Sequence, residues 1–599
     1  MLFHRPVRGE SADSASSVLS LNRRSPTMSR GKALTGAEEF RAARDLLLRH
    51  REDQERAHRE FIWPRPERFN WALDYFDELA ERRPDRTALW ILGQDGGRTK
   101  YTYRYMSERS SQVANWLNNQ GVRTGDRIML MLGNQVELWE TLLAAIKLGA
   151  VVIPTATNLS EGDLLDRLEI GEVSHVVCSA AETEKFETLR GHWTRICTGY
   201  VEGWLSYSDS EHAGLDFHPP HPTRPDDPLL LYFTSGTSSR PKLVSHTQSS
   251  YPIGHLSTMY WLGVQPGDVH LNVSEPGWAK HAYSSVFAPW NAEATVLVVD
   301  QERWETERLL NEVVRCGVDT LCAPPTVWRL FLQFDLTAWD VGLREAVSSG
   351  EPLNAEVVDK VREAWGVTVR DGFGQTETTI LIGNGPGQEV IPGSMGREMP
   401  GYDVTLADPV TDEPSTTGQI CVDMTTSPVG LMKGYSDRPQ LTREVTVRKR
   451  YRTGDIATRD TNGHITYIGR SDDVFKASDY RISPFEIESV LVEHEYVAEA
   501  AVVPSPHPLR RAVVKAYVSL AEGVPPDADT ARAVLAHARR RLSPYKWVRR
   551  LEFIELPKTA SGKIRRVELR QAESERGTAT DDTRNPREYW EEDLPSLRD

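Results

Sequence analysis

The sequence lacks three features that would each define a class of protein. No segment approaches the ~18 consecutive apolar residues that a membrane-spanning helix needs. Acidic residues outnumber basic ones by 86 to 71, and the formal charge of -15 disfavours nucleic acid and anionic membrane as partners. The cysteines contain no C-x-x-C pair, which disfavours a zinc site and a disulfide framework. A reducing cytoplasm is the expected location. The cysteines are Cys178, Cys197, Cys316, Cys322 and Cys421.

The first 32 residues also have little apolar content. They are rich in Ser and Arg and have no hydrophobic region of the kind that a secretory signal requires. Glu10 and Asp13 disfavour a transit peptide, and Met28 is an alternative initiation site. Residues 1–32 are therefore predicted to be a disordered or spurious extension.

The rest of the chain shows alternating strand and helix patterns. Its 599 residues predict two or more domains. An apolar strand at 127–132, a helix at 135–148 ended by Gly149, and a strand at 150–153 form one βαβ unit. Similar apolar runs at 175–178, 295–299 and 418–422 predict a large α/β body over residues 33–469.

A smaller α+β domain is predicted over residues 470–572. Ser483-Pro-Phe-Glu486 is a capping box with proline at the first helical position, which begins a helix running to about residue 493. Strands at 500–503, 512–520 and 551–556 and a helix at 529–542 complete the domain. An acidic tail, 573–599, follows, and its Tyr589 and Trp590 could anchor it to the body.

One loop is typical of a phosphate-binding site. The apolar strand 229–233 leads into Thr234-Ser-Gly-Thr-Ser-Ser-Arg-Pro-Lys242. Gly236 lets backbone N–H groups approach an anion, and Lys242 adds a positive charge. The hydroxyls of Thr234, Ser235, Thr237 and Ser238 can donate to phosphate oxygens. This is not a P-loop, because Pro241 and Leu243 flank the lysine. An ordinary surface turn is the alternative for such a strand exit.

Five further motifs follow in order: Gly350-Glu-Pro352, Gly374-Gln-Thr-Glu377, Tyr451-Arg-Thr-Gly-Asp455, Gly469-Arg-Ser-Asp-Asp473 and Pro557-Lys-Thr-Ala-Ser-Gly-Lys563. With the phosphate loop, they resemble the adenylate-forming superfamily of acyl-CoA synthetases, adenylation domains and luciferases, over roughly residues 70–570. The resemblance implies a large AMP-binding body with a small mobile C-terminal domain. It also implies ATP and Mg²⁺, with coenzyme A as cosubstrate.

The resemblance implies a role for individual residues. A carboxylate attacks the α-phosphate of ATP, so cations must converge there. Lys563 is expected at the α-phosphate, Lys242 at the phosphates and Glu377 on magnesium. Asp455 is expected on the ribose, Arg470 on the sugar or a phosphate, and Asp472 at the domain hinge. The adenine wall and its surroundings comprise Gly350, Glu351, Pro352, Asp371, Gly372, Phe373, Gly374, Gln375 and Thr376. Each of these residues, taken alone, is also compatible with an ordinary surface charge, turn or core position.

The resemblance is closest to the medium-chain acyl-CoA synthetases, through Glu275-Pro-Gly-Trp278, Ala323-Pro-Pro-Thr-Val-Trp328 and Asp371-Gly-Phe-Gly-Gln-Thr-Glu377. Acetyl-CoA synthetases carry tryptophan where this chain has Gly374, so the resemblance implies room for a longer, branched or aromatic acid. Trp278, Tyr283 and Trp328 are candidate pocket residues, with a plain core role as the alternative.

The sequence departs from the family pattern at two positions, and the second, Asp479, leaves the acceptor open. Ser239 replaces a common glycine of the phosphate loop, and Asp479 replaces a glycine beside the route of the pantetheine arm, near Arg481. The leading hypothesis is an ATP-dependent acid:CoA ligase. The alternative is a stand-alone adenylating enzyme that loads an acyl carrier protein. A non-catalytic nucleotide-binding homologue is disfavoured, because Lys563, Glu377, Asp455 and Lys242 are all present. The acid and the oligomeric state, monomer or homodimer, stay open.

Overall fold

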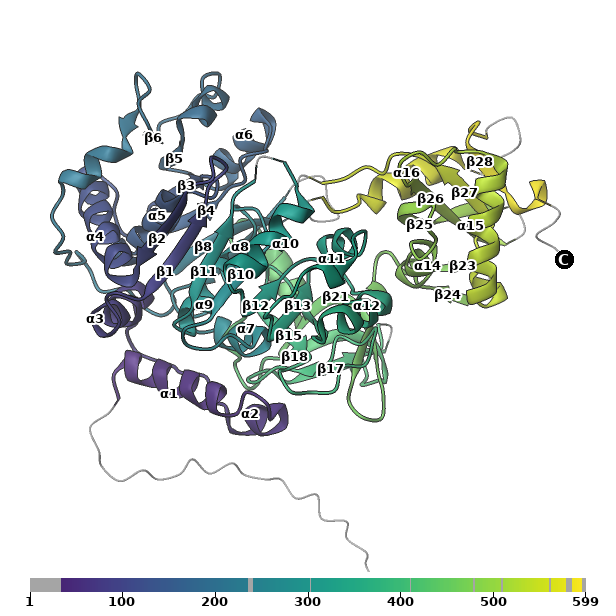
Figure 1. Ribbon diagram of the computed structural model, residues 1–599, viewed down its shortest axis with the longest axis horizontal. Coiled ribbons are helices and arrows are strands. Elements are labelled where there is room, and N and C mark those ends of the chain that lie inside the picture. The colour runs from purple at the N-terminus through teal and green to yellow at the C-terminus, as the bar shows by residue number, and fades with distance from the viewer. Residues whose placement is uncertain are drawn as a thin grey trace, which may run out of the picture.

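The computed structural model describes residues 34–234, 241–301, 303–409, 411–477, 480–507, 510–559, 562–577 and 584–594. A large α/β body carries a smaller α+β domain at one side (Figure 1), which confirms the predicted fold class. Two large sheets and one smaller sheet form the body, and their strands are largely buried.

The first sheet has nine strands in the order β16-β15-β14-β13-β12-β10-β11-β1-β2. Their bounds are β1 Thr87–Leu92, β2 Arg98–Thr102, β10 Val269–Asn272, β11 Thr295–Val299, β12 Thr320–Cys322, β13 Glu345–Ser349, β14 Val369–Gly374, β15 Ile380–Gly383 and β16 Arg397–Glu398.

The second sheet has eight strands in the order β19-β9-β8-β4-β3-β5-β6-β7. Their bounds are β3 Arg127–Met131, β4 Val151–Pro154, β5 His175–Ser179, β6 Thr194–Thr198, β7 Leu205–Ser206, β8 Pro228–Thr234, β9 Lys242–Thr247 and β19 Gly434–Tyr435. The third sheet contains β17 Val404–Ala407, β18 Thr417–Asp423, β20 Thr446–Val447, β21 Arg450–Arg459 and β22 Ile465–Arg470.

Helices cover these sheets. They are α1 Gly36–Arg49, α2 Gln54–Glu60, η1 Trp71–Asp77, α3 Glu78–Arg82, α4 Tyr103–Asn119, α5 Val136–Leu148, α6 Glu161–Ile170, η2 Ala180–Phe186, η3 Tyr207–His212, α7 His255–Leu262, α8 Ala279–Ala282, η4 Tyr283–Phe287, α9 Ala288–Asn291, α10 Thr306–Arg315, α11 Pro325–Phe331, η5 Leu336–Ala338, α12 Ala355–Trp365 and α13 Pro439–Val445.

The predicted βαβ unit is confirmed as β3, α5 and β4. Strands β3 and β4 pair in parallel, and Gly149 ends α5 in the left-handed region at φ 72°. Strands of a parallel sheet are covered on both faces, which explains their continuous apolar sequences. Of the five residues of β3, only Arg127 is not buried.

The small domain contains β23 Phe475–Ala477, β24 Tyr480–Ile482, α14 Pro484–Leu491, β25 Val497–His507, β26 Arg511–Leu520, α15 Ala528–Arg541, η6 Pro544–Lys546, β27 Arg550–Phe553, α16 Arg566–Arg576, β28 Glu588–Trp590 and η8 Glu591–Asp593. Ser483 caps α14 by accepting from the Glu486 N–H at 3.2 Å. The predicted capping box is only half formed among the described residues, because the Glu486 carboxylate pairs with Lys546. The Ser483 hydroxyl also donates to the Ile468 carbonyl of β22, which joins the domain to the body.

The predicted acidic tail differs from the structure in part. Helix α16 crosses the expected boundary at residue 572, and β28 pairs antiparallel with β27. Tyr589 lies opposite Leu551 and Trp590 opposite Arg550, so both aromatic residues anchor the chain to the small domain and not to the body.

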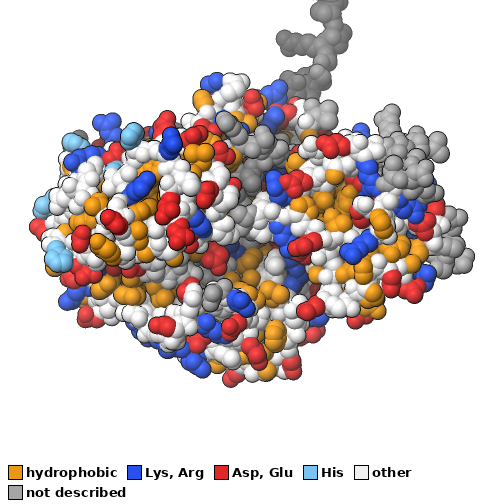
Figure 2. All heavy atoms as spheres, turned by 90° about the horizontal axis from the view of Figure 1, so that it is seen from above, with side chains coloured by type: hydrophobic (Ala, Val, Ile, Leu, Met, Phe, Trp, Pro, Cys, Tyr) orange, Lys and Arg blue, Asp and Glu red, His pale blue; other side chains and the backbone are white. Residues whose placement is uncertain are grey.

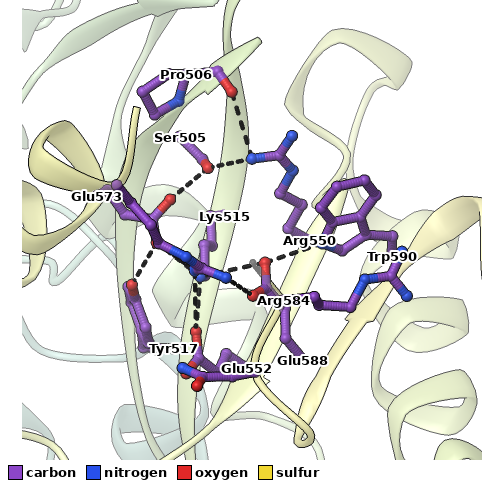
Figure 3. Close-up of polar contacts among 12 residues, drawn as sticks. Ser505, Pro506, Lys515, Tyr517, Arg550, Glu552, Glu573, Arg584, Glu588 and Trp590 are labelled. Carbon is purple, nitrogen blue, oxygen red and sulfur yellow. Dashed lines mark hydrogen bonds and ion pairs between the residues drawn. The ribbon is translucent and has the colours of Figure 1, made fainter. Parts of the chain in front are cut away.

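A buried ion network joins these late elements to the sheet (Figure 3). Lys515 on β26 lies 2.6 Å from Glu552, 2.7 Å from Glu573 and 3.3 Å from Glu588, and its side chain is fully buried. Burial alone would raise the pKa of Glu573, but Lys515 and hydrogen bonds lower it to about 2. The ammonium group therefore holds carboxylates from β27, α16 and β28 around one point.

All five cysteines are buried and none forms a disulfide. Burial raises the thiol pKa of Cys178, Cys197, Cys316 and Cys421. No helix of the described residues combines the length and apolar character that crossing a bilayer requires. Basic and acidic side chains are interspersed over the face in Figure 2.

Candidate active site

The end of the phosphate loop meets Glu377 through a tyrosine. Thr234 at the end of β8 lies opposite Lys242 at the start of β9. The Lys242 ammonium lies 5.3 Å from the centroid of the Tyr435 ring, and the Tyr435 hydroxyl donates to Glu377 Oε1 at 2.8 Å. Burial raises the pKa of Tyr435, and the negative charge of Glu377 raises it further. The hydroxyl therefore keeps its proton. Residues Ser235, Gly236, Thr237, Ser238 and Ser239 lie outside the described residues.

The donors present suit magnesium held together with substrate. In the described part of the chain, no cluster of three or more His, Cys, Asp or Glu could hold a metal ion alone. Magnesium usually takes one or two carboxylates and fills its remaining positions with water and substrate phosphates. Glu377 is a carboxylate beside the lysine that ends the phosphate loop, so it fits that requirement.

A second carboxylate, Asp455 on β21, is enclosed by polar groups. The Gln375 amide donates to its Oδ2 at 2.5 Å, the Tyr467 hydroxyl donates to its Oδ1 at 3.1 Å, and Arg470 lies 3.6 Å away. Burial raises the pKa of Asp455 to about 6, although Arg470 and the hydrogen bonds lower it. The structure thus brings together Gln375, Asp455 and Arg470 from three separate motifs, around an acceptor suited to sugar hydroxyls.

The predicted adenine wall lies at the ends of β13 and β14. Gly350 follows β13 at φ 101°, a conformation that favours glycine, and open space lies where its Cβ would be. Glu351 and Pro352 continue this turn, and the Thr326 hydroxyl donates to Glu351 at 3.4 Å. The ring of Phe373 is half-buried, 6.4 Å from that of Tyr467.

Close packing or a hydrogen bond from other parts of the body fixes the backbone at three nearby positions. A Cβ at Gly372 would meet the Trp261 indole at 2.4 Å, and the Thr376 carbonyl accepts from His246 Nε2 at 2.7 Å. At Gly374 a Cβ would lie 2.4 Å from the Thr379 carbonyl oxygen. This close approach of the backbone is a second reason for glycine at position 374, and the room for an acyl chain beside Gly374 stays a prediction.

A lysine that the motif analysis missed lies beside this wall. The Lys280 ammonium on α8 donates to the Ser349 carbonyl at 3.2 Å. Its pKa is lowered by burial and also by the positive charge of Lys563. Burial raises the pKa of Asp371 to about 7, although the Gly372 and Leu353 N–H groups and Lys280 lower it. The sequence signal was a lysine two residues after Trp278 in a quoted motif.

Lys563 is carried by a tight turn of the small domain. Gly562 has φ 81°, and the Lys563 N–H donates to the Thr559 hydroxyl at 3.2 Å. The side chain is exposed. Three residues later, Arg566 donates two hydrogen bonds to the Glu488 carboxylate, from Nε at 2.8 Å and from Nη2 at 2.6 Å. The negative charge of Glu351 of the body is among the influences that raise the pKa of Arg566. Arg566 thereby fixes the start of α16 to α14, directly after the turn that carries Lys563.

The predicted hinge directly follows the strand that carries Arg470. Arg470 Nε lies 3.4 Å from Asp472, and the Ser471 N–H donates to the Gly454 carbonyl at 2.8 Å. Asp473 pairs with Arg570 of α16. The connection between body and small domain thus begins within the sugar-site motifs.

The remaining predicted residues are spread more widely. The Tyr283 hydroxyl lies 2.8 Å from Ser349 Oγ, next to Lys280. Trp328 is fully buried among Phe331 and Trp365, and its indole N–H donates to the Val347 carbonyl of β13 at 3.4 Å. Trp278 begins α8 and lines an internal cavity. Arg481 lies on β24, and Asp479 lies outside the described residues.

The fold and these motifs define a family of nucleotide-dependent enzymes. Residues 76–436 match the AMP-binding enzyme family, and residues 486–563 match the AMP-binding enzyme C-terminal domain. The chain belongs to the AMP-binding enzyme family, and the predicted resemblance to acyl-CoA synthetases is confirmed.

Relatives and solved structures agree. The chain is 42% identical to 4-hydroxybutyrate--CoA ligase 1 of Metallosphaera sedula, over 85% of this chain and 91% of the relative. It is 35% identical to acyl-coenzyme A synthetase ACSM3, mitochondrial, of Homo sapiens, over 85% of this chain and 90% of the relative. A benzoate CoA ligase from Burkholderia xenovorans LB400 is similar in structure, with TM-score 0.72 and 27% identity over 84% of this chain and all of the other.

Proposed function

We propose that the protein is an ATP-dependent acid:CoA ligase that forms an acyl-AMP and transfers the acyl group to coenzyme A. The observation that carries this proposal is the meeting of Gln375, Asp455 and Arg470, from three separate motifs, around one acceptor suited to sugar hydroxyls. Lys242 and Lys563 would supply the cations that suit a reaction between two anions, a carboxylate and ATP.

In the first half-reaction, a carboxylate oxygen of the acid forms a bond to the α-phosphorus of ATP while the bond to pyrophosphate breaks. Lys563 neutralises charge on the α-phosphate and the carboxylate, and Lys242 acts at the other phosphates. Asp455 accepts hydrogen bonds from the ribose, and Gln375 orients its carboxylate. Glu377 would hold Mg²⁺, which when bound would supply charge neutralisation for the departing pyrophosphate.

In the second half-reaction, the thiol of coenzyme A loses its proton to solvent, its sulfur attacks the acyl carbon, and AMP leaves with the electrons of the broken C–O bond. We propose that the small domain turns about Asp472 between the two steps, so that Lys563 withdraws. Arg481 on β24 and the neighbouring Asp479 are proposed to lie along the pantetheine route. The curated relatives are named as CoA ligases and acyl-CoA synthetases, which favours coenzyme A over a carrier protein.

The proposed substrates are carboxylic acids of four or more carbons, straight, branched or aromatic. The relatives include a 4-hydroxybutyrate–CoA ligase and a benzoate CoA ligase, which support this range. The five reduced, buried cysteines support a reducing compartment such as the cytoplasm.

Pyrophosphate release tests the proposal. Purified protein is assayed with ATP, Mg²⁺ and acids of two to eight carbons, with and without coenzyme A. We expect acid-dependent pyrophosphate release that becomes catalytic when coenzyme A is present. Turnover that requires a phosphopantetheinyl carrier protein instead of coenzyme A would favour the carrier-loading alternative. No acid-dependent release would contradict the proposal.

A further inference from the structure

A small cavity lies behind the segment that carries Lys280. Its volume is about 20 Å³, and its walls come from β3, β4, α5, β8 and the region from Gly277 through η4. Leu138, Leu142 and Leu230 are among the apolar side chains that line it, and Trp278 forms another part of the wall. A cavity of this size holds one small group, since a water-sized probe needs about 10–15 Å³.

His281 is the exception in this apolar lining. The side chain is 95% buried, since its exposed fraction is 5%, and it lines the cavity. Its Nε2 has no hydrogen-bond partner among the described residues. Burial lowers the pKa of His281 to about 3, so the imidazole is neutral at physiological pH. A buried polar nitrogen without a partner costs free energy, which a hydrogen bond from a bound molecule would offset.

A lone water molecule is poorly suited to this place. Buried water usually makes about three hydrogen bonds, and among the described side chains that line the cavity only His281 has a buried polar atom without a partner. A hydroxyl tethered to an alkyl chain needs only one partner, because the carbon that carries it fills the apolar remainder. A neutral imidazole also cannot compensate a buried carboxylate.

The position of the cavity relates it to the reacting end of the substrate. Lys280 and Tyr283, which flank His281 in sequence, both contact Ser349 beside the adenine wall. Trp278, a predicted acyl-pocket residue, lines the cavity itself. One short segment, 278–283, therefore presents a cation toward the nucleotide site and an imidazole toward the cavity.

We propose that the cavity receives the distal end of the acyl chain and that His281 Nε2 hydrogen-bonds a hydroxyl carried there, so that a short hydroxylated carboxylic acid is the preferred substrate class. This inference rests on the proposed function, since it assumes that the protein activates carboxylic acids. His281 becomes a specificity-determining residue for that reaction.

The test compares two acids of equal length that differ only at the last position. In 4-hydroxybutyrate a hydroxyl stands where pentanoate has a methyl group. We expect the wild-type protein to prefer 4-hydroxybutyrate in kcat/KM, measured by acid-dependent pyrophosphate release. His281→Phe keeps a planar ring but no nitrogen, and should lower the ratio of the two kcat/KM values roughly tenfold, mainly through the hydroxy acid. His281→Gln keeps hydrogen-bonding capacity and should retain more of the ratio.

A second variant fills the cavity without touching the imidazole. Ala282 also lines the cavity, and Ala282→Leu should lower kcat/KM for both acids while acetate activation persists. This variant keeps the inference testable if His281→Phe does not fold, which thermal unfolding reports. The inference would be overturned if His281→Phe activated both acids with an unchanged ratio of their kcat/KM values. It would also be overturned if Ala282→Leu left the dependence of kcat/KM on chain length unaffected. Either result would leave the proposed function standing. Failure of the wild-type protein to activate any acid would overturn the proposed function as well.

Discussion

Charge at the candidate site is set by a few residues that come from distant parts of the sequence. Lys280 and Lys563 lie in different domains, and the charge of Lys563 lowers the pKa of Lys280 less than burial does. A partly buried ammonium group such as that of Lys280 is stabilised by a nearby anion, so the arrangement is suited to binding one.

The contribution of Lys563 is expected to be confined to acyl-AMP formation. Lys563→Ala should lower the rate of acyl-AMP formation at least a hundredfold, because it removes a cation from the transition state of pyrophosphate departure. Thioester formation from supplied acyl-AMP should persist. Lys558→Ala is the matched control, since Lys558 lies in the same loop but pairs with Glu499 at 2.7 Å. Near wild-type acyl-AMP formation by Lys563→Ala would refute this role.

The raised pKa of Asp455 predicts a pH effect on ATP binding. Because its pKa is about 6, the carboxylate keeps its proton below that pH and loses it above. The ionised acceptor is therefore present at pH 7 and mostly absent at pH 5. We expect KM for ATP to rise about tenfold on acidification from pH 7 to pH 5.

The comparison with Asp455→Asn separates this effect from the titration of ATP itself. The amide does not ionise, so the variant should bind ATP more weakly than the wild-type protein at pH 7. At pH 5 the KM for ATP of the variant should approach that of the wild-type protein. A ratio that stays constant across this range would show that Asp455 does not govern the pH dependence.

At the scale of elements, the connection between β22 and the small domain deserves the most direct test. Asp472→Pro fixes φ at the proposed pivot. Acyl-AMP formation should persist, and thioester formation should fall at least tenfold, because one orientation of the small domain is trapped. Asp472→Ala is the control, since it removes the carboxylate and leaves the backbone free. Equal loss of both half-reactions in a folded Asp472→Pro protein would argue against a hinge.

Local sequence patterns predicted most of the long elements. Strand β3, helix α5 and strand β4 followed from apolar runs and from Gly149, because burial on both faces leaves a continuous hydrophobic sequence. Strands of two residues, such as β16 and β19, have no periodicity and depend on partners elsewhere in the chain.

The residues of the candidate site were predictable where a motif fixed the residue type. They were less predictable where the role of a residue depends on its neighbours in space. Asp455 and Gln375 meet as the ordered motifs predicted. Tyr435 and Lys280 were missed, because a single Tyr or Lys has no pattern until the fold sets it beside Glu377 or Ser349. Gly374 suggested open space in the sequence, and the nearby Thr379 carbonyl gives the glycine a second reason that the sequence does not show.

At the scale of the whole molecule, the late part of the chain completes the small domain. In the sequence, Glu573 and Glu588 belong to the predicted acidic tail. Their partner Lys515 lies 58 residues before Glu573, so no local pattern connects it to them. In the structure these carboxylates surround a buried ammonium group (Figure 3). Helix α16 and strand β28 thereby become part of the folded unit.

Removing the central ammonium should destabilise that unit strongly. Lys515→Met leaves buried carboxylates without their cation, and we expect a loss of about 3–5 kcal/mol in the free energy of unfolding. Denaturant titration of the full chain measures it. Arg532→Met is the matched control, because Arg532 pairs with Asp529 on the surface and should cost less than about 1 kcal/mol. Equal stability of both variants would show that the network is dispensable.

The burial of all five thiols has a practical consequence for watching the enzyme work. Thiol-reactive fluorophores attack the thiolate, which burial and the raised thiol pKa suppress at the native cysteines. The unmodified chain should therefore take up very little dye at its own cysteines. A cysteine introduced at exposed Tyr200 of the body and another at exposed Tyr545 of the small domain would carry a donor and acceptor pair. Energy transfer between the dyes would then report small-domain rotation during turnover, molecule by molecule.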